Sequence, residues 1–127
     1  MARLLLIDDD DHLCVYVKNF LEKRKIIVLI ANSGNEGIKL FQKENPDLVL
    51  LDIKMADMNG LDVLKQIKQL DPKSHVIMLT IASNDENKQK AKELGADGFI
   101  RKPIDEENLE GTVGLAIAKI ARERKKI

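Results

Sequence analysis

Five short apolar segments recur along the chain and predict β-strands. They span residues 3–8, 26–31, 47–52, 75–80 and 97–102. The first four are continuously apolar instead of alternating with polar residues, which is the pattern of strands covered on both faces in a parallel sheet.

The stretches between these segments carry apolar residues at helical spacing. They predict helices over residues 11–24, 34–44, 60–70, 84–94 and about 105–124. Two capping boxes, Ser33 with Glu36 and Ser83 with Glu86, mark helix starts. Strand and helix therefore alternate five times, which predicts an α/β fold with a parallel sheet and right-handed crossovers.

The first predicted helix places four apolar residues near helical spacing, so we expect one buried face there. These residues are Val15, Val17, Phe20 and Leu21. Cys14, the only cysteine, lies on the same helix and is expected to fill a helix face. A single cysteine supports neither a disulfide framework nor a thiolate zinc site.

Length and charge narrow the range of functions. A chain of 127 residues is close to the commonest size of one domain, and we expect a single domain over 1–127, with 122–127 as a solvated helix end or the start of a linker. Lys and Arg equal Asp and Glu at 21 each, so no basic excess favours nucleic acid or an anionic membrane. Neither a secretory signal nor an apolar run of 18 residues occurs, which favours the cytoplasm.

Polar residues follow four of the five predicted strands. Asp8 and Asp9 end the first, Asp52 the third, Thr80 the fourth and Lys102 the fifth. Ligands of open α/β sheets bind beyond the carboxyl ends of the strands. We therefore expect three carboxylates, a hydroxyl and an ammonium group to converge at one edge of the sheet.

Four consecutive carboxylates, residues 8–11, follow the first apolar segment. Two unit charges 4 Å apart repel by about 4 kcal/mol at an effective dielectric constant near 20. Carboxylate oxygens and water suit Mg²⁺, so a metal ion shared by Asp8, Asp9 and Asp52 would offset the repulsion. Asp10 and Asp11 are instead expected to cap the following helix and interact with its dipole.

Other chemistries lack their motifs. None of the seven glycines forms a Walker A loop or a G-x-G-x-x-G turn after the first strand. No Ser-His-Asp or Cys-His arrangement indicates a hydrolase. His12 and His75 are expected to be surface or helix-start residues without a catalytic role.

Four motifs, in this order and at predicted strand ends, resemble the response-regulator receiver domain of two-component signalling. They are LLLIDDDD, PDLVLLDIKMADMNG, VIMLT and DGFIRKP. The resemblance extends over essentially the whole chain. It implies a flavodoxin-like (βα)5 fold, with five parallel strands in the order 2-1-3-4-5 and helices on both faces.

The resemblance also implies a phosphorylation site. Asp52 would accept the phosphoryl group, and Mg²⁺, or Mn²⁺ in its place, would be bound by Asp9, Asp52 and the backbone carbonyl of Lys54. Asp8 would act through a metal-bound water. Thr80 would donate its hydroxyl to the phosphoryl oxygens, and Lys102 would pair with the Asp52 carboxylate and then with the phosphoryl group.

A switch is the function that the resemblance implies. Phe99 and Thr80 would change position on phosphorylation, and the face formed by the fourth helix, fifth strand and fifth helix would change its partner affinity. Lys102–Pro103 would be a cis peptide, and Gly60 would form the turn after the acceptor loop.

The implied partners are a histidine kinase or phosphotransfer protein as donor and a downstream output domain or protein, with a phosphorylation-dependent homodimer as a further expectation. Neither membrane nor nucleic acid is an expected partner of this domain. The chain would phosphorylate itself from its donor and dephosphorylate itself slowly, without multiple turnover of a metabolite.

Three departures from the family pattern carry expectations. Ala56 stands where proline is usual, which predicts a looser acceptor loop. Ile81 stands where a small residue is usual, and we hypothesise that it slows both phosphorylation and attack by water. The Lys54 ammonium either faces solvent or reaches the phosphoryl group.

Two alternatives stay open at this point. The first is a pseudo-receiver that is never phosphorylated and acts as a constitutive interaction module. The second is an aspartate-nucleophile phosphatase. That class has a second aspartate two residues after the nucleophile, where this chain has Lys54, so the sequence disfavours it.

Overall fold

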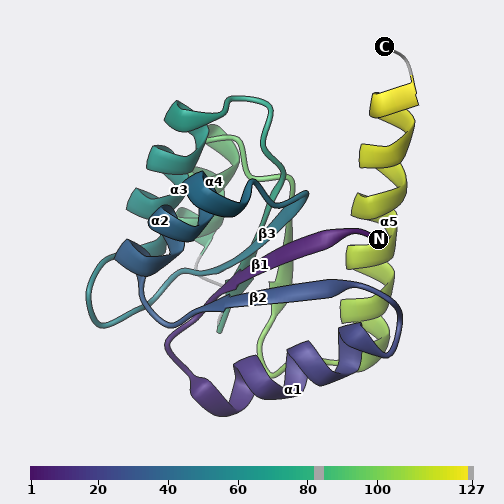
Figure 1. Cartoon of the computed structure of the whole chain (residues 1–127). Helices are drawn as coiled ribbons and strands as arrows, with labels where there is room; N and C mark the ends of the chain where they lie inside the picture. Colours follow the sequence, from purple (N-terminus) through teal and green to yellow (C-terminus); the bar gives the residue numbers. More distant parts are fainter. Residues whose placement is uncertain (82–84, 126–127) are drawn as a thin grey trace.

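A computed structural model describes residues 1–81 and 85–125 and shows strands and helices in strict alternation (Figure 1). Their order is β1 (Arg3–Ile7), α1 (Asp11–Glu22), β2 (Ile27–Ala31), α2 (Gly34–Glu44), β3 (Leu48–Asp52), α3 (Gly60–Leu70), β4 (Val76–Thr80), α4 (Asp85–Glu93), β5 (Gly98–Arg101) and α5 (Glu106–Lys125).

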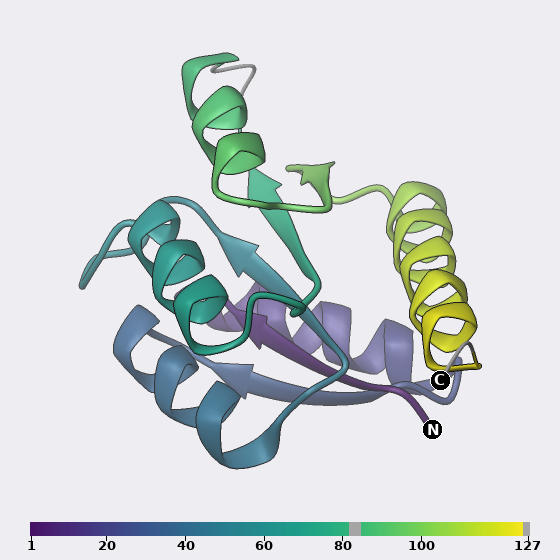
Figure 2. The same ribbon diagram turned by 90° about the horizontal axis from the view of Figure 1, so that it is seen from above.

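The strands form one parallel sheet in the order β2-β1-β3-β4-β5, which confirms the expected topology. Helices α1 and α5 cover one face, and α2, α3 and α4 cover the other (Figures 1 and 2). The α/β class and flavodoxin-like arrangement are therefore those expected from the sequence.

Each face of the sheet has its own apolar core, and this explains the continuously apolar strands. Side chains alternate between the two faces of a strand. In β1, Leu4 and Leu6 pack toward α1 and α5, whereas Leu5 and Ile7 pack toward α2 and α3. All four are fully buried. A strand with helices on both sides therefore has no polar face.

Two expectations about buried positions are wrong. Val15 is 56% exposed, because the buried face of α1 is formed by Cys14, Val17, Phe20 and Leu21. One residue corresponds to 100° on a helix, so Val15 turns away from this face. Ile27 is 38% exposed because β2 is an edge strand, at which burial on both faces is incomplete.

The predicted helix ends are largely observed. The Asp10 carboxylate caps α1 by accepting a hydrogen bond from the Leu13 amide, and Ser33 caps α2 in the same way through the Glu36 amide. Gly95 follows α4 with φ of +100°, a conformation that favours glycine. The expected box at Ser83 lies outside the described residues.

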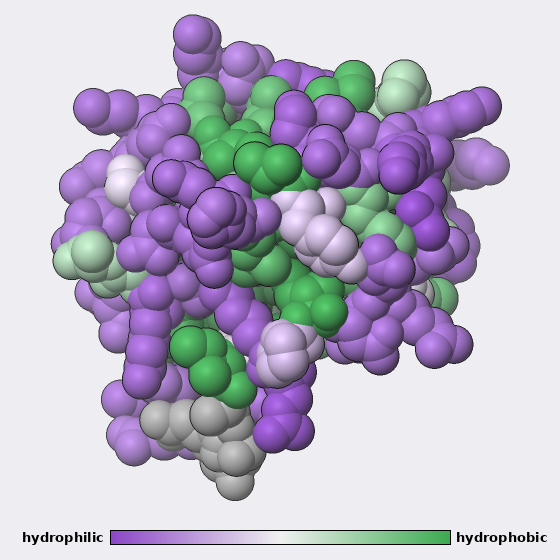
Figure 3. Space-filling model, turned by 90° about the horizontal axis from the view of Figure 1, so that it is seen from below, coloured by the Kyte–Doolittle hydropathy of each residue, from purple (hydrophilic) through white to green (hydrophobic). Residues whose placement is uncertain are grey.

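Figure 3 shows the molecule from below the view of Figure 1. This surface is mainly polar, and a broken band of apolar residues crosses it. Within the described residues, no helix is long and apolar enough to cross a bilayer. Residues 122–125 continue α5.

Candidate functional site

The carboxyl ends of β1 and β3 lie side by side, and this places two of the predicted acids together. The strands are neighbours, with Ile7 in register with Leu51, so the residues that follow, Asp8 and Asp52, emerge at the same edge. The backbone amide of Asp8 donates to the Ala31 carbonyl of β2 at 3.1 Å, which fixes the chain where it leaves the sheet.

Three carboxylates form an acidic cluster at this edge. One oxygen each from Asp8, Asp9 and Asp52 lies within 4.8 Å of the others. Asp8 is fully buried and Asp52 is 4% exposed, whereas Asp9 is exposed. The predicted convergence of these acids is present in the structure.

Lys102 enters the cluster from the end of β5. Its ammonium lies 2.8 Å from Asp8 Oδ2 and 3.2 Å from Asp52 Oδ1. Its backbone amide donates to the Thr80 carbonyl at 2.7 Å, and the Lys102–Pro103 peptide is cis, as predicted. Part of the repulsion between the buried acids is therefore offset by a cation of the chain itself.

The charges in the cluster shift one another's pKa. Burial, together with the charge of Asp8, raises the pKa of Asp52 from 3.8 to about 6, although Lys102 opposes this rise. Burial alone would lower the pKa of Lys102, but its contacts with Asp8 and Asp52 outweigh burial and raise it. A pKa of about 6 leaves Asp52 mostly ionised at neutral pH, and the raised pKa of Lys102 favours its charged form.

Thr80 shares a small pocket with Asp52. The pocket has a volume of about 100 Å³ and is lined by Asp52, Ile53, Lys54, Leu79, Thr80, Ile81 and Asn87. Thr80 is 7% exposed at the end of β4, while Ile81 is 63% exposed. The effects of Ile81 and Lys54 on reaction rates stay predictions.

The loop between β3 and α3 returns tightly to the end of β3. The amide of Gly60 donates to the Ile53 carbonyl at 2.6 Å. A Cβ atom at residue 60 would lie 2.0 Å from the carbonyl oxygen of Asp52, so only glycine fits this close approach. Gly60 therefore forms the turn after the loop.

Two contacts of this loop were not foreseen from the sequence. The Ala56 amide donates to Asp9 Oδ2 at 2.9 Å, and the Asp57 carboxylate accepts hydrogen bonds from the amides of Gly34 and Asn35 at 3.0 and 3.1 Å. A backbone donor leaves no sequence signal, and Asp57 is distant in sequence from the helix that it caps.

Phe99, the predicted switch aromatic, lies on β5 and is half-buried against the core shared by α2, α3 and α4. The Lys88 ammonium of α4 lies 5.9 Å from the centre of its ring. The proposed movement of Phe99 stays a prediction.

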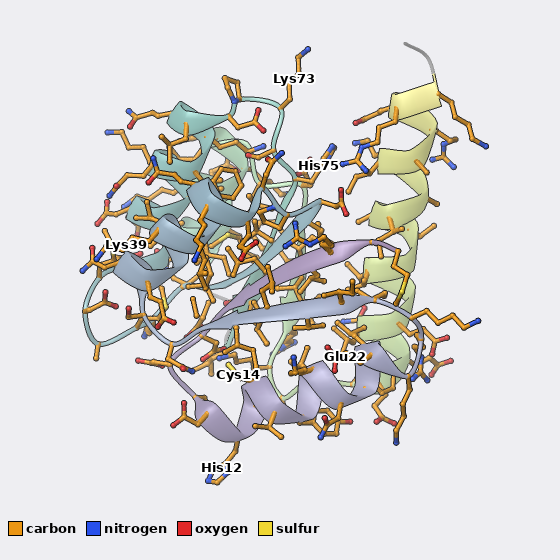
Figure 4. All side chains as sticks on the ribbon, viewed as in Figure 1. His12, Cys14, Glu22, Lys39, Lys73 and His75 are labelled. Carbon is orange, nitrogen blue, oxygen red and sulfur yellow. The ribbon has the colours of Figure 1, made fainter. Side chains whose placement is uncertain are left out.

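The histidines are not part of the acidic cluster, whereas the Cys14 thiol donates a hydrogen bond to the backbone carbonyl of Asp8 at 3.3 Å. His12 projects from α1 away from the sheet, and Cys14 lies between α1 and the sheet (Figure 4). Burial, together with the charge of Asp8, raises the pKa of the Cys14 thiol to about 12. The sequence predicted His75 to be an isolated surface or helix-start residue. In the structure its Nε2 instead lies 3.0 Å from Glu123 Oε2.

The residues of the acidic cluster fit a divalent cation. The donors are all oxygens, which Mg²⁺ prefers, and they come from one exposed and two buried carboxylates. Three carboxylates face one ammonium group, which leaves an excess of negative charge. Mn²⁺ shares this preference for carboxylate and water ligands.

Comparison with known proteins identifies the family. The family model of the response regulator receiver domain matches residues 4–114. The chain therefore belongs to the response regulator receiver domains of two-component systems. Members of this family act in phosphorylation-based signalling with histidine kinases and output domains, and generally bind Mg²⁺ at an acidic pocket.

The similar proteins are of two kinds: proteins that this chain matches over most of their length, and a longer regulator of which it matches only a part. Protein PilH of Pseudomonas aeruginosa is 33% identical over 120 residues, which cover 93% of this chain and 99% of PilH. The chemotaxis protein CheY of Halobacterium salinarum is 34% identical, over 80% of this chain and 85% of CheY. The transcriptional regulatory protein ZraR of Escherichia coli is 36% identical over 91% of this chain, which spans about a quarter (26%) of ZraR.

Solved structures agree with this assignment. A CheY-like receiver domain protein from Methanospirillum hungatei has a TM-score of 0.93 and 31% sequence identity, over 97% of this chain and 98% of that chain. A receiver domain protein from Clostridium thermocellum has a TM-score of 0.90 and 32% identity, with 100% of both chains covered.

Proposed function

We propose that this chain is a phosphorylation-dependent switch in which Asp52 accepts a phosphoryl group from a phosphohistidine of a partner kinase or phosphotransfer protein. The observation that carries the proposal is the position of Lys102, whose ammonium lies between the buried carboxylates of Asp8 and Asp52 beside the pocket that Thr80 lines.

The transfer exchanges one bond for another. An Asp52 carboxylate oxygen attacks phosphorus, the P–N bond to the donor imidazole breaks, and the imidazole leaves with the electron pair and takes up a proton. In the second half of the cycle, water attacks phosphorus, and the P–O bond to Asp52 breaks with its electron pair left on the carboxylate. Inorganic phosphate leaves, and the attacking water gives up a proton. The chain thus dephosphorylates itself slowly without turning over a metabolite.

Asp9, Asp52 and the backbone carbonyl of Lys54 are the proposed metal ligands, with Asp8 acting through water. Mg²⁺, or Mn²⁺ in its place, would supply positive charge to the phosphoryl oxygens. The oxygen-only donor set supports this assignment. Asp52 is ionised at neutral pH, as a carboxylate nucleophile must be.

Lys102 and Thr80 are the proposed partners of the phosphoryl group. Lys102 has a raised pKa, so it stays charged and can pair with an added phosphoryl oxygen. Thr80 lines the same pocket as Asp52, so its hydroxyl is proposed to donate to another oxygen. Charge and hydrogen bonds would then reach the group from two strands.

The added charge would act on α4, β5 and α5. Movement of Thr80 toward the phosphoryl group would free space for Phe99, and the face formed by α4, β5 and α5 would change its affinity for an output domain or protein. A homodimer formed through this face on phosphorylation belongs to the same proposal.

The test is to incubate the chain with Mg²⁺ and acetyl phosphate and to measure its intact mass. We expect the gain of one phosphoryl group, which EDTA prevents and Asp52→Ala abolishes. Asp62→Ala removes an exposed acid just after the loop and should leave the gain unchanged. No gain from any donor would instead favour the pseudo-receiver alternative.

A further inference from the structure

Asp9 is held differently from the other two acids of the cluster. Its Oδ2 accepts a hydrogen bond from the Ala56 amide at 2.9 Å, the only hydrogen bond that its side chain makes within residues 1–81 and 85–125. Asp8, by contrast, accepts from the Asp10 amide at 3.0 Å and contacts Lys102. The orientation of the exposed Asp9 carboxylate therefore depends on one backbone donor.

This donor exists because residue 56 is not proline. Proline, the residue expected here from the family resemblance, has no backbone N–H to donate. The departure from the family pattern therefore adds a hydrogen bond to a proposed metal ligand.

The donor is also held in place by its neighbour. Both oxygens of Asp57 accept hydrogen bonds from amides of α2, those of Gly34 and Asn35. The first amides of a helix have no partners within the helix, and they favour a negative charge. These hydrogen bonds favour the ionised carboxylate and lower the pKa of Asp57.

Close packing reinforces this attachment. A Cβ atom at Gly34 would lie 2.5 Å from Met58 Cγ, so the side chain of Met58 rests directly on the backbone of α2. Ala56 thus precedes two residues, Asp57 and Met58, that are both docked on a helix. Its N–H donates to Asp9 from a loop whose next two residues contact α2, and the looser loop expected from the sequence stays a prediction.

We propose that the Ala56 amide is a positioning group that orients Asp9 for divalent-cation binding. It holds Oδ2 and leaves Oδ1 of Asp9 without a protein partner among the described residues, and one oxygen of this carboxylate lies within 4.8 Å of oxygens of Asp8 and Asp52. A hydrogen bond to one atom of a metal-binding side chain fixes the orientation of the atom that contacts the metal. The inference rests on the proposed function, because it assumes that Asp9 binds the metal.

The test compares Ala56→Pro, which removes the N–H, with Ala56→Ser, which keeps it. Mg²⁺ affinity is measured by isothermal titration calorimetry at fixed pH and ionic strength. We expect Ala56→Pro to raise the Kd about tenfold, the lower end of the effect of losing such a hydrogen bond, and Ala56→Ser to leave it unchanged. An equal or lower Kd for Ala56→Pro would overturn the inference.

A second measurement does not require the proline variant to fold. In the metal-free chain, we expect the Ala56 amide to be protected from hydrogen exchange, and Asp9→Ala to accelerate its exchange about tenfold. Asp11→Ala, which removes a nearby acid not bonded to Ala56, should have no effect. Unprotected exchange in the unaltered chain would overturn the inference.

Failure of the proposed function would look different. If the unaltered chain did not bind Mg²⁺ at all, the metal site itself would be wrong, and the role of Ala56 with it. If it bound Mg²⁺ while Ala56→Pro bound equally well, only the role of Ala56 would be wrong.

Discussion

Two aspartates mark the two ends of β3, and their surroundings shift the pKa in opposite directions. Asp47 precedes the strand and accepts hydrogen bonds from the Arg3 amide and the Arg124 guanidinium. Burial opposes ionisation of Asp47, but these donors outweigh it and lower the pKa. At the other end, burial and Asp8 raise the pKa of Asp52 to about 6.

The opposite pKa shifts distinguish Asp47, which stabilises the fold, from Asp52, which is placed for chemistry. At the amino end of the strand, a carboxylate is surrounded by donors and helps to fix α5 against the sheet. At the carboxyl end, a carboxylate is buried beside another acid and an ammonium group, which is an unfavourable arrangement for the free chain. Such an arrangement is typical of functional sites, where like charges are kept for a ligand or a reaction.

The largest effect should come from removing the cation of the acidic cluster. Lys102→Met leaves Asp8 and Asp52 buried without their ammonium partner. We expect the free energy of unfolding, measured with urea in EDTA, to fall by about 3 kcal/mol. Mg²⁺ should restore part of this loss. An unchanged urea midpoint would show that Lys102 does not stabilise the two buried carboxylates.

The second-largest effect should be a gain in stability. In the absence of metal, Asp52→Asn should raise the free energy of unfolding at pH 7, because a pKa of about 6 instead of 3.8 corresponds to an energetic cost of about 2–3 kcal/mol for the ionised group. The contribution of Asp52 to stability is fully present below pH 3.8 and is lost as the pH rises through about 6. The advantage of the variant should therefore disappear near pH 4, and urea titrations at the two pH values test this.

A smaller effect is expected at the amino end. Asp47→Asn should lower the free energy of unfolding at pH 7 by about 1 kcal/mol, because it weakens charge-assisted hydrogen bonds that are partly exposed. The folded-state pKa of Asp47 is lowered, so its stabilisation is present above pH 3.8 and declines as the pH falls below that value. Asp62→Asn, at an exposed site, is the matched control. A stabilising effect of Asp47→Asn would contradict the comparison.

The carboxyl-end site was largely predictable because parallel strands place their carboxyl ends at one edge. Asp8 and Asp52 could be paired from the sequence alone, since each follows a continuously apolar segment. The same reasoning predicted metal as the partner of these acids, and the family resemblance implied that Lys102 pairs with Asp52. The structure adds that Lys102 also contacts Asp8. The strand ends placed the Lys102 ammonium at the same edge as the acids, but no pattern in the sequence shows that it contacts Asp8 as well as Asp52.

Other features were out of reach of sequence reasoning for identifiable reasons. The Ala56 hydrogen bond comes from the backbone, which every residue except proline carries. Asp57 caps a helix that begins more than twenty residues earlier (at Gly34), so no local capping pattern reveals it. Val15 was placed in the buried face because apolar spacing alone does not say which of two adjacent residues faces the sheet.

The central claim, that Asp52 is the phosphoryl acceptor, is tested most directly by locating the modified residue. After reaction with acetyl phosphate and Mg²⁺, borohydride reduces an aspartyl phosphate to homoserine, which peptide mass mapping identifies. We predict homoserine at residue 52 in samples with Mg²⁺ and none in samples with EDTA. Homoserine at Asp8, Asp9 or Asp57 in place of Asp52 would contradict the account.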